Sequence, residues 1–391
     1  MKKIKLMNRI AAVGTDRLDR KVYEVGEAVG APDAIMVRSA ALHDLEFNPE
    51  LLAIARCGAG VNNIPVSRCS EAGIVVFNTP GANANAVKEL ALCALVLASR
   101  GIVGGIEWAK TIDRSSDVAA AVEKGKGAFA GVELWGKTLG IVGLGAIGGL
   151  VANAATHLGM NVLGYDPYIT VDAAWKLSRS IGHAASLDEI YEKSDYITLH
   201  IPSVPATRGM INAQTLAKMK DGVRIINLAR ADLVNVPDIA AALGSGKVAS
   251  YVTDFPTNET VAVPQIINIP HLGASTAEAE DNCAVMAADE LNEYLTTGNI
   301  RNSVNFPSVD VPVTGNSRVS ILHRNVPSII AGITGAVSAK GLNIENMTNK
   351  SRGDNACTLL EISGGKLKED EASKLASDIA SIEGVLRVRT I

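Results

Sequence analysis

Thr138 to Asp166 reads TLGIVGLGAIGGLVANAATHLGMNVLGYD, in which a G-x-G-x-x-G motif follows one apolar run and precedes another. The run from Thr138 to Gly143 predicts a buried parallel strand, and the alanine-rich segment after the motif predicts a helix to about His157. Asn161 to Tyr165 predicts a second strand. This strand–helix–strand order around the glycines is typical of a Rossmann-type domain that binds a dinucleotide.

The residues of the motif have separate roles in holding a dinucleotide. Gly143 permits the tight turn, Gly145 lets the pyrophosphate approach the backbone, and Gly148 lets helix and strand pack closely. The free N–H groups of Ala146 and Ile147, at the helix start, are expected to bind the phosphates. A glycine motif alone is a weak signal, because many such motifs are only glycine-rich turns. The flanking strands and helix make this one specific.

Asp166 ends the second strand, 18 residues beyond Gly148. An acidic side chain there accepts a hydrogen bond from the ribose 2′-hydroxyl and repels a 2′-phosphate. The sequence therefore predicts NAD, rather than NADP, as the cofactor. His200, which follows the predicted strand Tyr196 to Leu199, is placed in the same cofactor site.

The composition limits the class of protein. With 391 residues the chain exceeds one ordinary domain, so two or three domains are expected. A net charge of −4 without a basic block argues against nucleic acid or an anionic membrane as a partner. The longest apolar run, Leu90 to Ser99, is too short to cross a bilayer. The five scattered cysteines form no C-x-x-C pair, which favours a reduced, cytoplasmic protein.

Short apolar runs also occur on both sides of the central stretch. Runs at 34–37, 51–56 and 74–77 end in Arg, Gly and Asn residues, which indicates a small open α/β sheet of the flavodoxin-like kind with ligand groups along one edge. A long helical pattern from Ala84 to about Ala109 leads into the dinucleotide-binding region. Beyond Asp166, strands alternate with helices, which predicts a mostly parallel, doubly wound sheet.

The last part of the chain changes character. Residues 299–317 lose periodicity and are rich in Asn, Ser, Pro and Gly, which predicts a flexible linker. Residues 318–391 show the β-α-β-β-α-β order of a ferredoxin-like fold. We therefore expect a substrate-binding domain of residues 1–85 plus 274–298, an NAD-binding domain of residues 86–273, the linker, and a C-terminal domain.

Arg230, Glu259 and His271 lie beyond predicted strands. An arginine can hold a carboxylate bidentately, and a histidine exchanges a proton with a hydroxyl near neutral pH. A glutamate beside the histidine stabilises the imidazolium. Each of the three residues can equally be an ordinary surface or loop residue, and the residues alone leave both interpretations open.

The chain resembles the D-isomer-specific 2-hydroxyacid dehydrogenase family from about Val37 to its C-terminus. The motifs that carry the similarity are VRSA at 37–40, RCGAGVNN at 56–63, NTPGANANAVKELAL at 78–92, GKTLGIVGLGAIG at 136–148, GYDP at 164–167, NLAR at 227–230 and PHLGAST at 270–276. The resemblance implies that Arg230 binds the substrate, that His271 is the acid/base and that Glu259 is its partner.

The resemblance also implies that Asp254 approaches the nicotinamide amide. It assigns the carboxylate or phosphate end of the substrate to residues of the N-terminal region, namely Arg38, Arg56, Gly58 and Asn62. The sequence departs from the family pattern at Ala231, where glycine is usual after the arginine. It departs again at Phe255 and Pro256, where Val and Phe usually follow the aspartate.

Residues 318–391 resemble an ACT domain of the serine-sensing kind. His323, Asn325 and Asn343 match the pattern of residues that bind the amino acid, and Ser328 replaces the usual glycine. The amide groups offer donors and acceptors to L-serine, and His323 can donate to its carboxylate or hydroxyl. A plain dimerisation module is the alternative interpretation of these residues.

The resemblance implies NAD-dependent oxidation of 3-phospho-D-glycerate, the first step of L-serine biosynthesis, by a homodimer or homotetramer with L-serine as the candidate effector. One alternative is another D-2-hydroxyacid dehydrogenase, such as a glyoxylate or hydroxypyruvate reductase, which a substrate panel would separate. The other is a non-catalytic NAD-sensing regulator of the same fold, against which the intact Arg–Glu–His trio argues.

Overall fold

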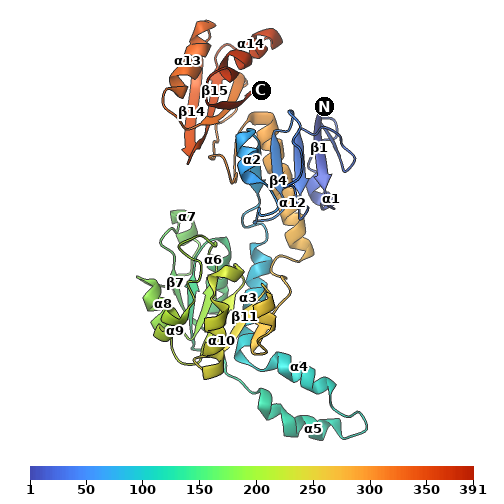
Figure 1. The fold of residues 1–391 in the computed structure, drawn as a ribbon, viewed down its shortest axis with the longest axis vertical. Helices are drawn as coiled ribbons and strands as arrows, with labels where there is room; N and C mark the ends of the chain where they lie inside the picture. The colour runs from blue at the N-terminus through green and yellow to red at the C-terminus, as the bar shows by residue number, and fades with distance from the viewer. The chain divides into compact units, whose positions relative to one another are not determined.

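The computed structural model describes residues 1–391, which divide into two compact units (Figure 1). One unit comprises Met1–Asn83 and Ala277–Ile391, and the other comprises Ala84–Thr276. The chain enters the second unit at the start of α3 (Ala84–Ser99) and returns to the first at the start of α12 (Ala277–Thr297).

The N-terminal sheet of the first unit has five parallel strands in the order β2-β1-β3-β4-β5. These are β1 (Lys2–Met7), β2 (Tyr23–Gly26), β3 (Ala34–Val37), β4 (Ala53–Arg56) and β5 (Val75–Asn78). The order is flavodoxin-like, as the sequence predicts. The apolar runs in the sequence predict neither β1 nor β2. In β1, lysines interrupt the apolar residues.

Helices cover both faces of this sheet. On one face, α12 packs its buried residues, Leu291 and Tyr294 among them, against the strands. On the other, α2 (Val66–Glu71) contributes Cys69 to a separate apolar cluster. Because the helices lie on the two faces, the carboxyl ends of the strands form an edge from which the side chains of the following loops can project.

The second unit contains a seven-stranded parallel sheet in the order β12-β11-β10-β9-β6-β7-β8. Its strands are β6 (Thr138–Val142), β7 (Asn161–Tyr165), β8 (Gly182–His183), β9 (Tyr196–Leu199), β10 (Val223–Asn227), β11 (Val248–Thr253) and β12 (Ile266–Asn268). The strand order reverses on either side of β6, which is the doubly wound Rossmann arrangement. The predicted fold class is therefore confirmed for this unit.

Helices lie on both faces of the seven-stranded sheet. On one face, α3 packs with α6 (Ala146–His157), and on the other lie α8 (Leu187–Lys193), α9 (Ala213–Lys218) and α10 (Val236–Ser245). Ser186 caps α8 and Asn212 caps α9 through side-chain oxygens that accept from backbone N–H groups. These capped starts agree with the sequence signals at both positions.

The predicted helix from Ala84 to about Ala109 is two helices. α3 ends at Ser99, and α4 (Ile102–Lys110) leaves it at an angle of 72°. Gly101, where the backbone bends, is the N-cap of α4. No single helix is long and apolar enough to cross a bilayer; α3 and α4 meet that criterion only jointly, as a bent pair.

An arm extends from the second unit (Figure 1). It consists of α4, α5 (Val118–Gly125) and the 3-10 turn η1 (Lys126–Phe129), and the rings of Trp108 and Phe129 lie 5.4 Å apart inside it. Neither α4 nor α5 has a buried residue.

The C-terminal residues form a four-stranded antiparallel sheet in the order β14-β15-β13-β16. Its elements are β13 (Ser317–Arg324), α13 (Ile329–Ala339), β14 (Ile344–Arg352), β15 (Asn355–Ile362), α14 (Glu369–Ala380) and β16 (Val385–Thr390). This is the ferredoxin-like topology that the sequence predicts. Both helices pack on one face, where Ile333 and Leu375 join Val319 and Ile321 of β13.

The opposite face of this sheet is also buried. Leu322 and Leu359 belong to the same apolar cluster as Tyr294 of α12 and Phe306. Arg389 of β16 donates hydrogen bonds to the carbonyl oxygens at the end of α12. The C-terminal sheet and the N-terminal sheet of the first unit therefore share one core.

Residues 299–317, expected as a flexible linker, are packed into that core. Ile300 and Val309 pair with each other across an isolated β-bridge, and both side chains are fully buried. Buried Asn305 accepts a hydrogen bond from the Val76 N–H and donates to the Ile74 carbonyl. Apolar residues spaced among the polar ones anchor this segment, so its polar composition alone is misleading.

Candidate active site

The glycine motif forms the turn between β6 and α6. Gly143 has φ +91°, a region that side chains disfavour, and a Cβ there would lie 2.5 Å from the His200 carbonyl oxygen. A Cβ on Gly148 would lie 1.9 Å from the Gly143 carbonyl oxygen. Packing therefore requires both glycines. Gly145 differs, because a Cβ there would meet no atom within 4 Å. The open space before Gly145 fits the pyrophosphate of a dinucleotide.

The start of α6 supplies hydrogen-bond donors beside this space. The helix begins at Ala146 with Gly145 as N-cap, and no side chain caps it. The first-turn N–H groups, those of Ala146 and Ile147 included, receive no side-chain acceptor and carry the positive end of the helix dipole. An anion bound there would satisfy them.

Asp166 follows β7 and is tied to the glycine turn. Its Oδ2 accepts from the Leu144 N–H at 2.9 Å, and its Oδ1 accepts from the Tyr168 N–H at 2.9 Å. The half-buried carboxylate is thereby fixed at the end of β7, and each oxygen retains a further acceptor site. These sites suit the hydroxyl groups of a ribose.

His200 lies directly after β9, against the same turn. Burial lowers the pKa of His200 to about 4, so the imidazole is neutral near pH 7. Its Nε2 lies 3.0 Å from the Thr198 Oγ1, and its backbone N–H donates to the Val142 carbonyl. The neutral ring of His200 can pack against a cofactor and form hydrogen bonds, but it carries no charge.

Arg230 stands in the loop after β10, and fully buried Asn227 shapes that loop. Asn227 Oδ1 accepts from the N–H groups of Ala229 and Arg230, and Nδ2 donates to the Arg230 carbonyl at 2.8 Å. The Arg230 side chain is exposed, and Nη1 donates to the Ala229 carbonyl at 2.6 Å. The remaining guanidinium donors are available to a carboxylate.

Asp254 follows β11 and is 1% exposed. Its Oδ2 accepts from the Gly273 N–H at 3.1 Å, while its buried Oδ1 has no hydrogen-bond partner. Burial raises the pKa of Asp254, and the Gly273 N–H and the charges of His271 and Arg230 oppose that rise. An unsatisfied buried oxygen is costly, so an amide donor from a ligand would stabilise it. The nicotinamide carboxamide has such a donor.

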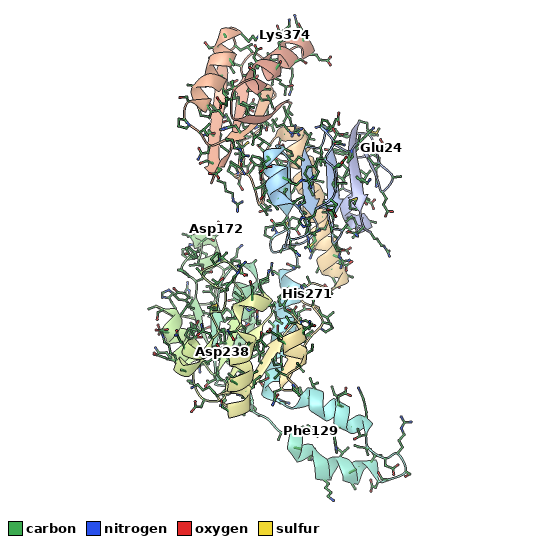
Figure 2. All side chains as sticks on the ribbon, in the orientation of Figure 1. Glu24, Phe129, Asp172, Asp238, His271 and Lys374 are labelled. Atoms are coloured by element: carbon green, nitrogen blue, oxygen red, sulfur yellow. The ribbon has the colours of Figure 1, made fainter.

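His271 lies in the loop between β12 and α12 (Figure 2). Its backbone N–H donates to the Asp254 carbonyl at 3.1 Å and to the Ile269 carbonyl at 2.9 Å. Its φ of +47° is uncommon for a residue with a side chain. The exposed imidazole packs against the ring of Phe255, with centroids 4.8 Å apart. The loop thus holds the histidine beside Asp254 in a strained conformation.

Glu259, the predicted partner of His271, lies on a separate short helix. Glu259 is exposed on the four-residue helix α11 (Asn258–Val261), which Thr257 caps. It lines a hollow whose other walls include residues from Ala231 to Pro237, and no ion pair joins it to the imidazole. Asp254 is therefore joined to His271 by a backbone hydrogen bond and feels the charge of Arg230, whereas Glu259 forms no ion pair with His271.

The N-terminal residues of the predicted site lie at adjacent strand ends of the first unit. Val37, the last residue of β3, pairs with Arg56, the last residue of β4, and Arg38 follows directly. Asn8 accepts from the N–H groups of Ser39 and Ala40 and so holds the loop after Arg38. Both arginines are therefore carried by the same edge of the sheet.

Gly58 and Asn62 belong to the loop after β4. Gly58 has φ +144°, and a Cβ there would lie 1.3 Å from Nη1 of Arg56. The missing side chain lets the guanidinium lie against the backbone. Asn62 is exposed, and its carbonyl oxygen lies 3.0 Å from Nε2 of His43.

Of the three C-terminal residues predicted to bind an amino acid, His323 is unsuitable. Its ring is 1% exposed, with Nδ1 2.7 Å from the Arg324 carbonyl and Nε2 2.9 Å from the Thr358 Oγ1. Both ring nitrogens are thus used within the sheet. Asn325 and Asn343 are exposed, and each uses its amide nitrogen as a donor within the domain.

Two residues beside the predicted site carry no sequence prediction of a role. Phe255 contacts the His271 ring, and Glu280 forms an ion pair with Arg38. Phe255 could have been noticed in the sequence, because it departs from the family pattern directly after Asp254. Glu280 lies in the first turn of α12, where an acidic residue is ordinary for a helix start.

Comparisons with known proteins agree with an NAD-binding domain in the second unit. Residues 103–273 match the family described as D-isomer specific 2-hydroxyacid dehydrogenase, NAD binding domain. D-3-phosphoglycerate dehydrogenase 2 of Saccharomyces cerevisiae is 32% identical over 343 residues, which cover 82% of this chain and 70% of that protein. D-3-phosphoglycerate dehydrogenase of Mycobacterium leprae is 36% identical over 287 residues, which cover 71% of this chain and 52% of that protein.

Among solved structures, NAD⁺-bound 3-phosphoglycerate dehydrogenase of Entamoeba histolytica aligns with a TM-score of 0.61 at 25% identity. The alignment covers 78% of this chain and 98% of that one. The chain spans little more than half the length of several curated relatives that it matches.

Proposed function

Because the chain belongs to the D-isomer-specific 2-hydroxyacid dehydrogenase family, we propose that it catalyses the NAD-dependent oxidation of 3-phospho-D-glycerate to 3-phosphohydroxypyruvate. Relatives named D-3-phosphoglycerate dehydrogenase at 32–37% identity support this substrate. In a cell, this reaction would begin the synthesis of L-serine. We propose that the protein carries out this reaction in the cytoplasm.

NAD, when bound, supplies the nicotinamide ring that accepts a hydride from C2 of the substrate. Gly145 and the uncapped start of α6 would hold its pyrophosphate, and Asp166 its ribose hydroxyls. The unpartnered Oδ1 of Asp254 would accept a hydrogen bond from the carboxamide. His200 would contact the cofactor as a neutral ring.

His271 takes the proton from the C2 hydroxyl in this proposal, and Arg230 orients the carboxylate. An imidazole is suited to the proton transfer because its ordinary pKa lies near neutrality. Glu259 would stabilise the imidazolium only after the His271 ring leaves Phe255. In the first unit, we assign the phosphate to Arg38 and Arg56, with Gly58 and Asn62 shaping the loop beside them.

The observation that carries the proposal is the placement of His271 and Arg230 around Asp254. The charges of both residues act on this buried carboxyl, whose free oxygen is suited to a nicotinamide amide. The test is a spectrophotometric assay of NADH formation by the full chain with 3-phospho-D-glycerate and NAD. Turnover of glyoxylate or hydroxypyruvate without turnover of 3-phosphoglycerate would reject the substrate assignment.

We also infer that the chain forms a homodimer or homotetramer through the arm. Val103, Ile106 and Val118 on its two helices are 43%, 53% and 45% exposed. Exposed apolar side chains on two adjacent helices are typical of a surface that another chain covers. Sedimentation equilibrium of the full chain tests this inference, and a monomer would contradict it.

The C-terminal sheet is proposed to be an ACT domain that binds L-serine as an inhibitor. Asn325 and Asn343 remain as exposed amides, while His323 is withdrawn from the proposed ligand set. Because residues 299–317 are packed, the effect of a ligand would pass through the shared core and α12 rather than through a flexible joint.

A further inference from the structure

Arg38 is already paired with a carboxylate of its own chain. Its Nη2 lies 2.5 Å from Oε1 of Glu280, and the two side chains are 42% and 41% exposed. Arg38 follows β3, whereas Glu280 lies in the first turn of α12. The pair therefore joins a strand end to a helix start within the first unit.

The same pair lies close to Arg56. Burial raises the pKa of the Cys283 thiol, Arg56 and Arg38 oppose that rise, and Glu280 adds to it. Val37, the residue before Arg38, pairs with Arg56 across β3 and β4, so the two arginines stand at neighbouring strand ends. Glu280 thus places a negative charge beside Arg38, one of the two cations that would receive an anionic group.

The carboxylate of Glu280 can be replaced at Arg38 by another anion. Exposed ion pairs contribute little to stability, because water screens them and two long side chains must be ordered. A phosphate dianion offers more acceptor oxygens and more charge than a carboxylate, so it can replace Glu280 at the guanidinium. Once the phosphate is bound, a nearby Glu280 carboxylate would repel it.

We propose that Glu280 is a specificity-determining residue that competes with the substrate phosphate for Arg38. This inference rests on the proposed function, because it takes the Arg38 ligand to be the phosphate of 3-phospho-D-glycerate. A substrate without a phosphate would leave the Arg38–Glu280 pair in place. The carboxylate therefore weakens binding of the phosphorylated substrate alone.

The test is Glu280→Gln in the full chain, with Glu278→Gln as the matched control. Glu278 lies in the same helical turn and is exposed, so its substitution changes net charge equally without touching Arg38. We expect Glu280→Gln to lower KM for 3-phospho-D-glycerate by about twofold to fivefold, the range that an exposed ion pair allows. The KM for D-glycerate should not change, and Glu278→Gln should change neither KM.

A raised or unaltered KM for 3-phospho-D-glycerate would overturn the inference, and so would an equal fall for both substrates. A raised KM would show that Glu280 positions Arg38. Titration calorimetry with 3-phospho-D-glycerate provides a second readout that does not need turnover. Tighter binding by Glu280→Gln without any NADH formation would support the competition and reject the proposed function. NADH formation with unaltered binding would support the proposed function and reject the competition.

Discussion

The imidazole ring of His271 packs against the ring of Phe255, with centroids 4.8 Å apart and planes tilted by 49°. Such ring pairs contribute roughly 0.5–1.5 kcal/mol beyond their buried area. The contact therefore favours the imidazole orientation seen here, in which Glu259 makes no ion pair with it. Valine, which the family pattern favours at position 255, has no ring to make this contact.

Phe255→Val should release the imidazole towards Glu259. Because a carboxylate nearby favours the imidazolium, the limb of the pH–rate profile assigned to His271 should move to higher pH. Phe255→Tyr keeps the ring and should retain the original profile. The measurement is kcat/KM for 3-phospho-D-glycerate across pH for the three proteins. An unaltered limb in Phe255→Val would show that the ring contact does not control the histidine.

His271→Ala should reduce kcat by roughly 10²–10⁴-fold, the usual contribution of a positioned acid/base. Glu259→Gln should instead retain turnover and shift the histidine limb of the kcat profile to lower pH, since in the substrate complex the ring is proposed to leave Phe255 for the Glu259 carboxylate. Steady-state rates across pH measure both effects. If Glu259→Gln shows the original profile, the Glu259 carboxylate does not act on His271.

Asp166 is expected to set the choice of cofactor. Asp166→Ala removes the acceptor for the ribose hydroxyls and the charge that repels a 2′-phosphate, so the preference for NAD over NADP should narrow. The ratio of kcat/KM for the two cofactors measures this preference. Because the carboxylate also accepts from the Leu144 N–H, Asp166→Asn is the companion variant that keeps an acceptor there. An unaltered ratio in both variants would remove Asp166 from this role.

Glu290 should make the stability of the fold depend on pH. Its side chain is buried, Oε1 accepts from Asn302 at 2.7 Å, and Oε2 has no partner. Burial raises the pKa of Glu290 from 4.5 to about 8. Between these values the folded state keeps a proton that the unfolded state releases, so stability falls as pH rises through this window and levels off above it.

The free energy of unfolding should therefore fall by up to about 1.4 kcal/mol per pH unit inside that window through this group. Glu290→Gln keeps an acceptor for Asn302 and removes the titration, so its unfolding free energy should depend less on pH. Urea unfolding at pH 5.5 and 7.5, at roughly the middle of the window, measures the slope. Equal slopes in Glu290→Gln and the unsubstituted chain would contradict the assignment.

Local patterns predicted the strand-end residues well. β7 begins and ends where the sequence predicts, because Gly159 and Asp166 bound a short apolar run. Parallel strands bring their carboxyl ends to one edge, so the sequence could group Arg230 and His271 together with Glu259. Asp254 entered the predicted site only through the family resemblance.

Side-chain orientation could not be predicted in this way. His323 lies on a strand whose two faces are both buried, one by α13 and α14 and one by the shared core, so alternation gives no sign of an exposed face. The orientation of His271 depends on packing against Phe255, and the ion pair of Arg38 depends on α12, which is distant in sequence. Such contacts come from tertiary packing, which local periodicity does not contain.

Ser328 stands where the family pattern has glycine, and its backbone conformation is strained. It precedes α13 with φ +66°, a left-handed conformation that glycine adopts freely and serine adopts with strain.

Asn343 provides the test of regulation by L-serine. Its amide is exposed and donates to the Ser363 Oγ at 3.1 Å, and its carbonyl oxygen can accept from a ligand ammonium group. Asn343→Ala should therefore weaken inhibition by L-serine and leave the uninhibited kcat close to that of the unsubstituted chain. Asn346→Ala, which alters an exposed amide of β14, is the matched control and should retain full inhibition. The measurement is the L-serine concentration that halves turnover of the full chain. Absence of both binding and inhibition at millimolar L-serine would reject the effector and leave the C-terminal sheet as an assembly module.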